Sequence, residues 1–492
     1  MVEKTGFEPA TPWSQTRCTT KLCNIPTSSA LYDFIIQFKL LQHFLNNVSK
    51  KFFMRYNEFM KIGIVSLGCS KNLIDSQTAM KFLTRQGHAF TANVREADVI
   101  IVNTCAFIND AKQESINTIL EMADYKESRC QKLIVMGCLP QRYRKDLENA
   151  LPEVDRFISI DEYDHLEDIL KEEIEPEAEK DCDIVLATKP WTGYLRIADG
   201  CNNKCAFCAI PNIRGQYKSV PFEKLLQEAA KLNEIGVKEI NLIAQDTSRY
   251  GFDLYSRNRL LDLLKELNAM DFHWIRILYL YPDLITEDFL KEMRKLEKVL
   301  PYFDMPVQHG SDRLLKAMRR ITDSSKIRTL TSSIRRVYDD PTLRTTIIVG
   351  FPSETRDDFK QLVEMVSEVK WDHLGAFKYS LEENTEAYDI RPRVAGKTAR
   401  NRLDKIMSLQ QEISVERKQR YVGQIMEVLV EGRDAIKKMY IGRNRTQAPD
   451  DIDGHTVFTS ERDIEPGIFV QVRITEIRGY DFYGVEIWKV LN

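Results

Sequence analysis

The sequence predicts an α/β protein built from three successive parts: an N-terminal parallel α/β domain, a central partial (β/α) barrel and a small C-terminal antiparallel β-barrel. Continuous apolar strands alternate with helical patterns in the first two parts, and that alternation is typical of parallel sheets covered by helices. Near the C-terminus the pattern changes to period-two alternation with frequent turn signals, which predicts a β-barrel. We expect the three parts to span residues 60–180, 188–421 and 423–492.

The composition excludes several classes of protein. The chain has 492 residues, 43% of them hydrophobic and 29% charged, as in ordinary globular proteins. A net charge of −3 provides no global basic field for nucleic acid. No run of 18 apolar residues is present, so no membrane span is predicted. Ten cysteines in a long, charge-rich chain indicate metal binding in a reducing, cytoplasmic setting and not a disulfide framework.

The first 59 residues differ from everything that follows. Met1–Ser29 is rich in Thr, Pro and Ser and has no periodicity, and Leu31–Leu45 is apolar but interrupted by polar residues. We interpret residues 1–59 as a leader outside the native fold, with Met60 as the expected start and Met54 as the alternative start. Cys18 and Cys23 then carry no chemistry, and the alternative is a genuine N-terminal arm.

In the N-terminal part, each of three predicted strands is followed by a cysteine. The strands are Ile62–Leu67, Ala97–Asn103 and Lys132–Met136, with helical patterns over Asn72–Gln86 and Asp110–Tyr125. The carboxyl ends of parallel strands meet at one edge of a sheet, where ligands bind. We therefore expect Cys69, Cys105 and Cys138 to converge into an iron–sulfur site with one open iron. The alternative for each cysteine is a small buried hydrophobe.

The other cysteines and the acidic stretch of this part receive simpler interpretations. Cys130 follows the polar run Glu127–Arg129, so we expect it to face solvent and not to bind metal, and we interpret Cys182 as a free thiol. The acidic stretch Asp161–Asp183 indicates a domain linker or a solvated edge helix, with a docking site for a basic partner as the alternative.

The central part opens with Cys201, Cys205 and Cys208, spaced C-x3-C-x2-C. Thiolates at that spacing can hold three corners of one iron–sulfur cluster and leave the fourth iron open to a small chelating molecule. A structural zinc site would need a fourth ligand nearby, whereas the nearest candidates, Cys182 and His273, are remote in sequence. The alternative is three cysteines that occur together by chance.

Six strands with helices between them predict the partial barrel, and the long helix from Thr398 to about Tyr421 closes it. The predicted strands are 194–197, 239–244, 274–281, 302–307, 343–349 and 373–379, and the helices 222–235, 260–269, 286–296, 311–319 and 355–369. Polar residues follow several strand ends, the catalytic face of such barrels. They include Gln245-Asp246, Gln308-His309 and the segment Gly350–Glu354.

The three-part order, the cysteine spacing and the dispersed cysteines together resemble the methylthiotransferase family of radical S-adenosylmethionine (SAM) enzymes with a C-terminal TRAM domain. Ser66–Ser76 and Asp199–Cys205 are similar to the RimO branch, and the tRNA-modifying MiaB branch usually carries Gln-Met-Asn in place of Ser70-Lys71-Asn72. The resemblance covers residues 61–492. RimO enzymes add a methylthio group to the β-carbon of an aspartate in small-subunit ribosomal protein twelve.

The resemblance implies two [4Fe-4S] clusters and SAM as cofactors. Cys201, Cys205 and Cys208 would hold the cluster that cleaves SAM to a 5′-deoxyadenosyl radical, and Cys69, Cys105 and Cys138 an auxiliary cluster that presents the sulfur. Gln245, Asp246, Gly350 and Glu354 would contact SAM; their alternative role is an ordinary strand-end turn with a helix cap. An electron donor and the ribosomal protein are the implied partners.

The charge of the C-terminal part separates two functions that share this chemistry. Residues 423–492 contain twelve acidic and nine basic residues. An RNA-binding domain normally shows a basic footprint, so the acidic balance favours a basic protein substrate over tRNA. A local basic patch of Lys437, Lys438, Arg443 and Arg445 stays open as the contrary interpretation. A non-catalytic iron–sulfur protein is the third alternative, although such a protein needs no open iron.

Overall fold

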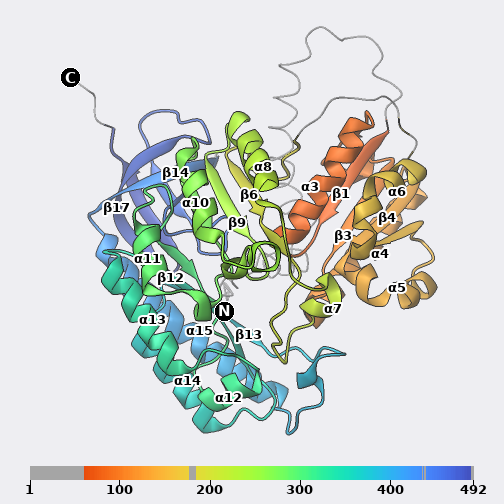
Figure 1. Cartoon of the computed structure of the whole chain (residues 1–492). Helices are drawn as coiled ribbons and strands as arrows, with labels where there is room; N and C mark the ends of the chain where they lie inside the picture. The colour runs from red at the N-terminus through yellow and green to blue at the C-terminus, as the bar shows by residue number, and fades with distance from the viewer. Residues whose placement is uncertain (1–59, 175, 177–183, 435, 437–438, 489–492) are drawn as a thin grey trace, which may run out of the picture.

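The computed structural model describes residues 60–174, 176, 184–434, 436 and 439–488. Figure 1 shows the N-terminal domain beside a central layer of strands and helices, with the C-terminal β-strands at the opposite side of the molecule. The leader, with Cys18 and Cys23, lies outside the described residues, as do Cys182, Lys437 and Lys438. None of the helices in the described ranges combines the length and apolar character needed to cross a membrane.

The N-terminal domain is a five-stranded parallel sheet in the order β2-β1-β3-β4-β5, which confirms the predicted sheet type. Its strands are β1 (Lys61–Ser66), β2 (Ala89–Phe90), β3 (Val99–Thr104), β4 (Lys132–Gly137) and β5 (Arg156–Ser159). The edge strands β2 and β5 were not predicted, because runs of two and four residues give little periodic signal.

Helices α3 (Ser70–Arg85), α4 (Asn109–Ala123), α5 (Cys138–Ala150) and α6 (Leu166–Glu173) cover this sheet. The acidic stretch contains α6, and its Leu166, Ile169 and Leu170 pack on the sheet with Ile62 and Ile64. The first half of that stretch is therefore an amphipathic helix that belongs to the domain core, rather than a linker. Most of its second half lies outside the described residues.

The central domain contains six parallel strands in two sheets, ordered β10-β9-β6 and β11-β12-β13. They are β6 (Thr192–Arg196), β9 (Glu239–Ile243), β10 (Trp274–Ile277), β11 (Tyr302–Asp304), β12 (Thr342–Val349) and β13 (His373–Lys378). A parallel bridge between Ile275 and Val299 continues the first sheet toward the second. The predicted partial barrel is confirmed, and a short antiparallel pair, β7 (Ala198–Asp199) with β8 (Lys218–Ser219), sits at its mouth.

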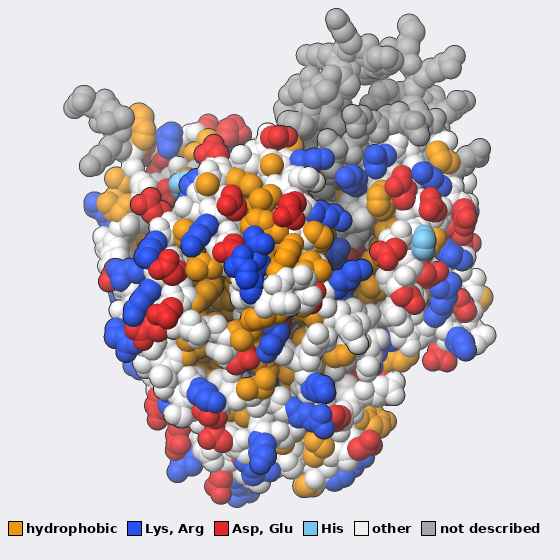
Figure 2. Space-filling view, viewed as in Figure 1, with side chains coloured by type: hydrophobic (Ala, Val, Ile, Leu, Met, Phe, Trp, Pro, Cys, Tyr) orange, Lys and Arg blue, Asp and Glu red, His pale blue; other side chains and the backbone are white. Residues whose placement is uncertain are grey.

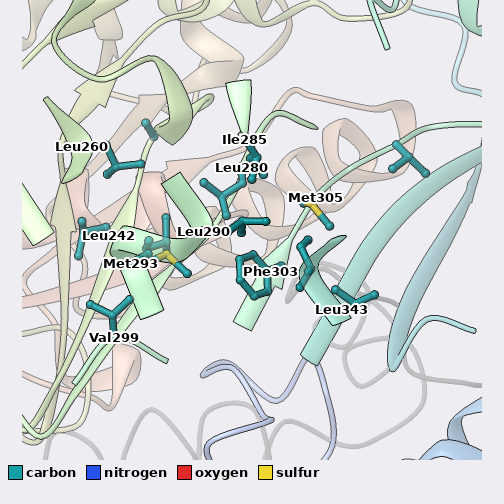
Figure 3. Packing of buried hydrophobic residues seen from close by; sticks show 14 of the residues in the cluster. Leu242, Leu260, Leu280, Ile285, Leu290, Met293, Val299, Phe303, Met305 and Leu343 are labelled. Atoms are coloured by element: carbon teal, nitrogen blue, oxygen red, sulfur yellow. The ribbon is translucent and has the colours of Figure 1, made fainter. Parts of the chain in front are cut away.

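Helices surround these strands, and the largest hydrophobic core lies between them. Figure 3 shows part of that core, where Leu242, Leu290, Met293 and Phe303 lie close together. The helices are α7 (Ile210–Arg214), α8 (Phe222–Glu234), α9 (Phe252–Tyr255), α10 (Leu260–Ala269), α11 (Glu287–Arg294), α12 (Asp312–Ala317), α13 (Ser324–Val337), α14 (Arg356–Val369) and α15 (Gly396–Lys418). Helix α13 was not predicted, because Ser, Thr and Arg dominate it and only a narrow apolar stripe is buried.

The C-terminal domain is a closed five-stranded barrel in the order β14-β15-β16-β18-β17. Its strands are β14 (Ile425–Asp434), β15 (Met439–Asn444), β16 (Thr456–Thr459), β17 (Phe469–Arg478) and β18 (Asp481–Glu486). Most neighbours pair antiparallel as predicted, whereas β16 and β18 pair parallel. Because β17 and β18 form a hairpin, closing the ring brings β18 beside β16 in the same direction.

Several charged residues of the C-terminal barrel are buried against the central domain. Arg443 is fully buried and ion-pairs with Glu239 at 2.6 Å and with Glu431 at 2.9 Å. Breaking such a buried pair from one side costs about 3–5 kcal/mol. Asp453 is also buried, and its carboxylate accepts a hydrogen bond from the Tyr302 hydroxyl at 2.6 Å.

These contacts correct the interpretation of the barrel's charge. Arg443 is not available to a surface basic patch, and Arg445 pairs with Asp340 at 2.6 Å. Asp453 and Glu431 are likewise internal charges, so the excess of acidic residues overstates the negative charge that a partner meets. On the face drawn in Figure 2, acidic and basic side chains are interspersed around the periphery and hydrophobic side chains gather toward the middle.

Candidate functional site

The cysteine loop, residues 201–208, lies between β7 and β8 at the barrel mouth. Gly200 enters it with φ +72°, and a Cβ there would lie 2.1 Å from the carbonyl oxygen of Gln216, so only glycine fits. The Cys201 amide donates to Gly215 O at 3.1 Å, and the Cys208 amide donates to Cys205 O at 3.1 Å. This tight backbone gathers Cys201, Cys205 and Cys208, which we call the loop triad.

Two further contacts hold the loop triad in place. The Ala206 amide donates to Met318 O at 3.0 Å, and its carbonyl accepts from the Ala387 amide at 2.8 Å. Beside the loop, the Arg320 guanidinium lies 3.6 Å from Cys205 Sγ and 3.9 Å from the centre of the Tyr281 ring. A guanidinium in this position stabilises a thiolate at Cys205.

Burial raises the thiol pKa values of two members of the loop triad, Cys201 and Cys208. The pKa of Cys201 rises to about 11, and that of Cys208 rises well above its ordinary value, with the neighbouring thiols adding to the effect of burial. Cys201 and Cys208 are therefore protonated at neutral pH in the metal-free protein, and a metal must displace their protons when it binds.

The strand-end triad, Cys69, Cys105 and Cys138, occupies the carboxyl edge of the N-terminal sheet. Cys69 precedes α3, Cys105 directly follows β3, and Cys138 begins α5. A Cβ built on Gly68 would lie only 3.3 Å from Cys105 Sγ, so the first two loops are in direct contact. Burial and the charges at Cys138 and Cys69 raise the pKa of Cys105. The structure thus places all three cysteines at this edge of the sheet, with Cys105 near the other two.

Asn72 connects the three loops of the strand-end triad. Its amide nitrogen donates to Leu67 O at 3.0 Å and to Thr104 O at 2.9 Å, each just upstream of a triad cysteine. Its amide oxygen lies 3.6 Å from Cys138 Sγ. One buried side chain therefore fixes the spacing of all three cysteine loops.

Arg214 connects the two triads. It lies at the end of α7, a few residues beyond the cysteine loop, and its guanidinium donates to Asn72 Oδ1 at 2.8 Å and lies 3.9 Å from Cys138 Sγ. Asp75 and Asp199 accept from the same guanidinium at 2.7 and 3.0 Å. This role could not be predicted from the sequence, because Arg214 belongs to the central domain while Cys138 and Asn72 belong to the N-terminal domain.

Cys130 is buried, whereas the sequence predicted that it faces solvent. Its side chain is 5% exposed and packs in the core beside Leu133, and its Sγ lies 3.1 Å from Lys132 O. The prediction that it faces solvent is wrong, since the chain turns inward at the start of β4. Its position before β4 separates it from Cys138, which follows that strand.

The four residues expected to contact SAM lie at strand ends of the central domain. Gln245 donates to Asp199 at 2.7 Å, and its buried Oε1 has no hydrogen-bond partner within the described ranges. Asp246 is fully buried and accepts from Asn203 of the cysteine loop at 2.8 Å and from Arg249 at 3.0 Å. Asp246 therefore fixes the loop, whereas Gln245 offers a free acceptor beside it.

Gly350 and Glu354 form a second strand-end turn after β12. Gly350 has φ +75°, and a Cβ there would lie 2.6 Å from the Ala399 Cβ of α15. Glu354 accepts from the Gly350 amide and pairs with Arg402 at 3.0 Å, and His309 lies 3.6 Å from its other oxygen. That oxygen, Oε1, has no hydrogen-bond partner in the part of the chain that is described.

Lys71 also lies at the junction of the two domains, a position that no pattern in the sequence predicted. Its side chain is 5% exposed, and its ammonium lies 3.2 Å from the centre of the Tyr279 ring. Burial lowers the pKa of Lys71 to about 8. Tyr279, Cys69 and Ser70 line a cavity of about 20 Å³ that the C-terminal barrel closes with Asp450.

A larger cavity lies away from both triads. It has a volume of about 730 Å³, lies between the amino ends of β9 and β10 and the C-terminal barrel, and is lined in part by Lys238, His273, Trp274 and Phe469. Because neither triad lines this cavity, the two triads remain the centre of the candidate site.

The donor chemistry of the two triads fits iron–sulfur clusters. Each supplies three cysteine sulfurs with a guanidinium beside one of them, and thiolates are the usual ligands of such clusters. Within the described residues, no three His, Cys, Asp or Glu side chains form a group suited to a single metal ion.

Comparison with known proteins identifies each part of the chain. Residues 61–159 match the uncharacterized protein family UPF0004, residues 195–366 the radical SAM superfamily, and residues 422–487 the TRAM domain. The solved structure of the radical SAM methyltransferase TsrM from Kitasatospora setae is 11% identical, covers 76% of this chain and 82% of its own, and has a TM-score of 0.48.

The curated relatives match over nearly their whole length. The ribosomal protein uS12 methylthiotransferases RimO of Caldicellulosiruptor saccharolyticus and Alkaliphilus oremlandii are each 44% identical, cover 86% of this chain, and are covered over 99% and 98% of their own length. RimO of Clostridioides difficile is 44% identical and is covered completely, over 88% of this chain. With this identity and its three matching domains, the chain belongs to the RimO family of radical SAM methylthiotransferases.

Proposed function

We propose that this chain adds a methylthio group to the β-carbon of an aspartate in ribosomal protein uS12. The observation that carries the proposal is that Arg214, which follows the loop triad in the central domain, contacts Cys138 of the strand-end triad and Asp199 just before the cysteine loop. Relatives that are 44% identical to this chain over most of its length are named ribosomal protein uS12 methylthiotransferases. A ribosomal substrate makes the enzyme cytoplasmic.

Cys201, Cys205 and Cys208 would hold the [4Fe-4S] cluster that binds SAM, as in the radical SAM superfamily. When bound, this cluster and SAM supply the radical chemistry that activates a C–H bond, after an electron arrives from a donor protein. The chain's own residues hold the loop: Asp246 fixes Asn203, and Arg320 balances the charge at Cys205. The unpartnered oxygen atoms of Gln245 and Glu354 support roles for these residues in contacting SAM.

Gly350 supports the proposed SAM site through its backbone. Because its conformation and the close approach of Ala399 exclude a side chain, only glycine allows the chain to turn here directly after β12. The support for Asp246 as a direct SAM ligand is weaker, because its carboxylate already accepts hydrogen bonds from Asn203, Ser248 and Arg249.

Cys69, Cys105 and Cys138 would hold a second [4Fe-4S] cluster, which presents the sulfur to be transferred. Support comes from Asn72, which spaces the three cysteine loops, and from the burial of Cys105 and Cys138, which excludes water from the sulfur chemistry. Three cysteines leave one iron without a protein ligand, where a sulfur species can bind.

Arg214 is expected to tune this second cluster. In a background in which the loop triad is replaced by Ala, the change Arg214→Gln should make the midpoint potential of the remaining cluster more negative. The reason is that a cation and a hydrogen-bond donor near a cluster sulfur stabilise the reduced, more negative state. Redox titration followed by electron paramagnetic resonance (EPR) measures the shift.

Arg144→Gln is the matched control for that titration. Arg144 lies on α5 and pairs with Glu148 and Glu162, on the surface of the same domain. It should leave the potential unchanged. An equal potential in the Arg214→Gln and Arg144→Gln proteins would show that Arg214 does not act on the cluster.

Mass spectrometry of small-subunit ribosomal proteins from cells with and without this gene tests the proposed function. The wild-type cells should contain uS12 heavier by about 46 Da on an aspartate, the gain for replacing H by SCH3, and the deletion strain should contain unmodified uS12. Unchanged uS12 modification in the deletion strain would reject the function.

A further inference from the structure

Lys71 differs from the other buried cations of this protein. Seven Lys and Arg residues are buried in the described part of the chain, and six of them donate to a carboxylate or a carbonyl: Arg276, Arg320, Arg344, Arg402, Lys418 and Arg443. Lys71 forms no hydrogen bond or ion pair within the described ranges; its neighbour is the Tyr279 ring. A buried ammonium without an anionic partner is costly, so the site needs an explanation.

The position of Lys71 places its charge at the mouth of the barrel. Lys71 lies in the first turn of α3, two residues after Cys69, yet its ammonium lies over Tyr279, which follows β10 of the central domain. The Tyr279 amide donates to Asp304 at 3.0 Å, which fixes the residue with φ +60°. The Lys71 ammonium of the N-terminal domain therefore packs against a tyrosine of the central domain that is itself held in place by Asp304.

The nearest acidic groups are already paired with other cations. Asp304 pairs with Arg344 at 2.7 Å, and Asp199 pairs with Arg214 at 3.0 Å. Because each carboxylate already forms an ion pair, neither is free for Lys71. The two guanidiniums, of Arg344 and Arg214, are also held in place by further acceptors. An anion that arrives with the substrate is the partner that this arrangement lacks.

We propose that the Lys71 ammonium binds the carboxylate of the substrate aspartate. The inference rests on the proposed function and names the residue that recognises the acidic side chain. The reacting β-carbon of aspartate is bonded directly to the carboxyl carbon, so holding the carboxylate beside Cys69 also positions the C–H bond to be replaced. Lys71 then selects an acidic side chain over a neutral one, because only the former neutralises the buried charge.

A competing role for Lys71 is to balance the negative charge of the cluster at the strand-end triad. Both roles use the same ammonium, but they respond differently to the substrate. If Lys71 binds the aspartate carboxylate, its removal weakens binding of a charged substrate side chain and not of a neutral one. If Lys71 balances the charge of the cluster, its removal affects both substrates equally.

A double-mutant cycle separates the two roles. The reconstituted enzyme, as wild type and as Lys71→Met, is titrated with uS12 and with uS12 in which the modified aspartate is replaced by asparagine, and the Kd of each pair is measured. Methylthiolation of the aspartate form is followed in parallel. Methionine keeps the length of the side chain and removes the charge. Lys81→Met, on the same helix and partly exposed, is the matched control.

The proposal predicts that Lys71→Met weakens binding of the aspartate form by about 30-fold or more, the cost of removing one partner of a buried charge pair. Binding of the asparagine form should not change, kcat/KM for the aspartate form should fall at least as much as its affinity, and Lys81→Met should match wild type in every measurement. Iron content and the EPR spectrum of the second cluster should be retained.

Equal losses on both forms of uS12, or no loss on either, overturn the proposal, and equal losses with an altered EPR spectrum would assign Lys71 to the cluster instead. A wild-type enzyme that modifies tRNA and leaves uS12 untouched would reject the proposed function itself and this inference with it. If the wild-type enzyme modifies uS12 but Lys71→Met changes the Kd of the aspartate and asparagine forms by the same factor, only the role of Lys71 is rejected.

Discussion

Replacing Cys201, Cys205 and Cys208 together by Ala is expected to abolish SAM cleavage. The loop triad holds the only open iron proposed to bind SAM, so no residual route to 5′-deoxyadenosine remains in the variant. Iron per chain should fall from about eight atoms to about four, the content of one remaining cluster. Anaerobic reconstitution, iron analysis and chromatography of 5′-deoxyadenosine measure both quantities.

Cys130→Ala controls for the loss of a buried cysteine as such. Cys130 packs in the core and lies at the opposite end of β4 from Cys138, so its removal should leave iron content and SAM cleavage at wild-type values. Thermal unfolding of each variant shows whether the fold is retained. SAM cleavage that survives in the folded triple variant would contradict the assignment of the loop triad.

Replacing Cys69, Cys105 and Cys138 by Ala should have the complementary effect. Transfer of the methylthio group should stop, and 5′-deoxyadenosine should still be formed, because the cysteine loop is anchored by Met318 and Ala387 of the central domain and not by the strand-end triad. Iron should again fall by about half. The same two measurements, with mass spectrometry of uS12, test this separation.

Single variants check which cysteine completes the strand-end triad. Cys105→Ala should lower the iron content, and Cys130→Ala should not, since burial and its neighbours Cys69 and Cys138 place Cys105 in the site. Unchanged iron in Cys105→Ala together with less iron in Cys130→Ala would identify a different third ligand.

The sequence predicted the parts of the fold whose pattern is local. The apolar runs of β1, β3 and β4 and the cysteines after them could be read directly, because a buried parallel strand is a continuous apolar run. The short edge strand β2 and the polar helix α13 were not predicted, because the burial of these segments depends on neighbours that are distant in sequence.

The side chains that join the domains could not be predicted. Arg214 contacts Asn72 across 142 positions of sequence, and Lys71 reaches Tyr279 of another domain. The error at Cys130 has the same origin, because its polar neighbours suggested solvent while the fold turned its thiol into the core. The net charge of the C-terminal barrel was a poor guide to its surface charge for the same reason, because Arg443 and Asp453 form ion pairs inside the protein.

The substrate is the central claim, and a competition assay tests it most directly. The reconstituted wild-type enzyme is given uS12 and unmodified tRNA together, with SAM, a reductant and a sulfide source. The proposed function predicts a gain of about 46 Da on one aspartate of uS12 and no methylthiolated adenosine in the tRNA. Methylthiolated adenosine with an unmodified uS12 would contradict it.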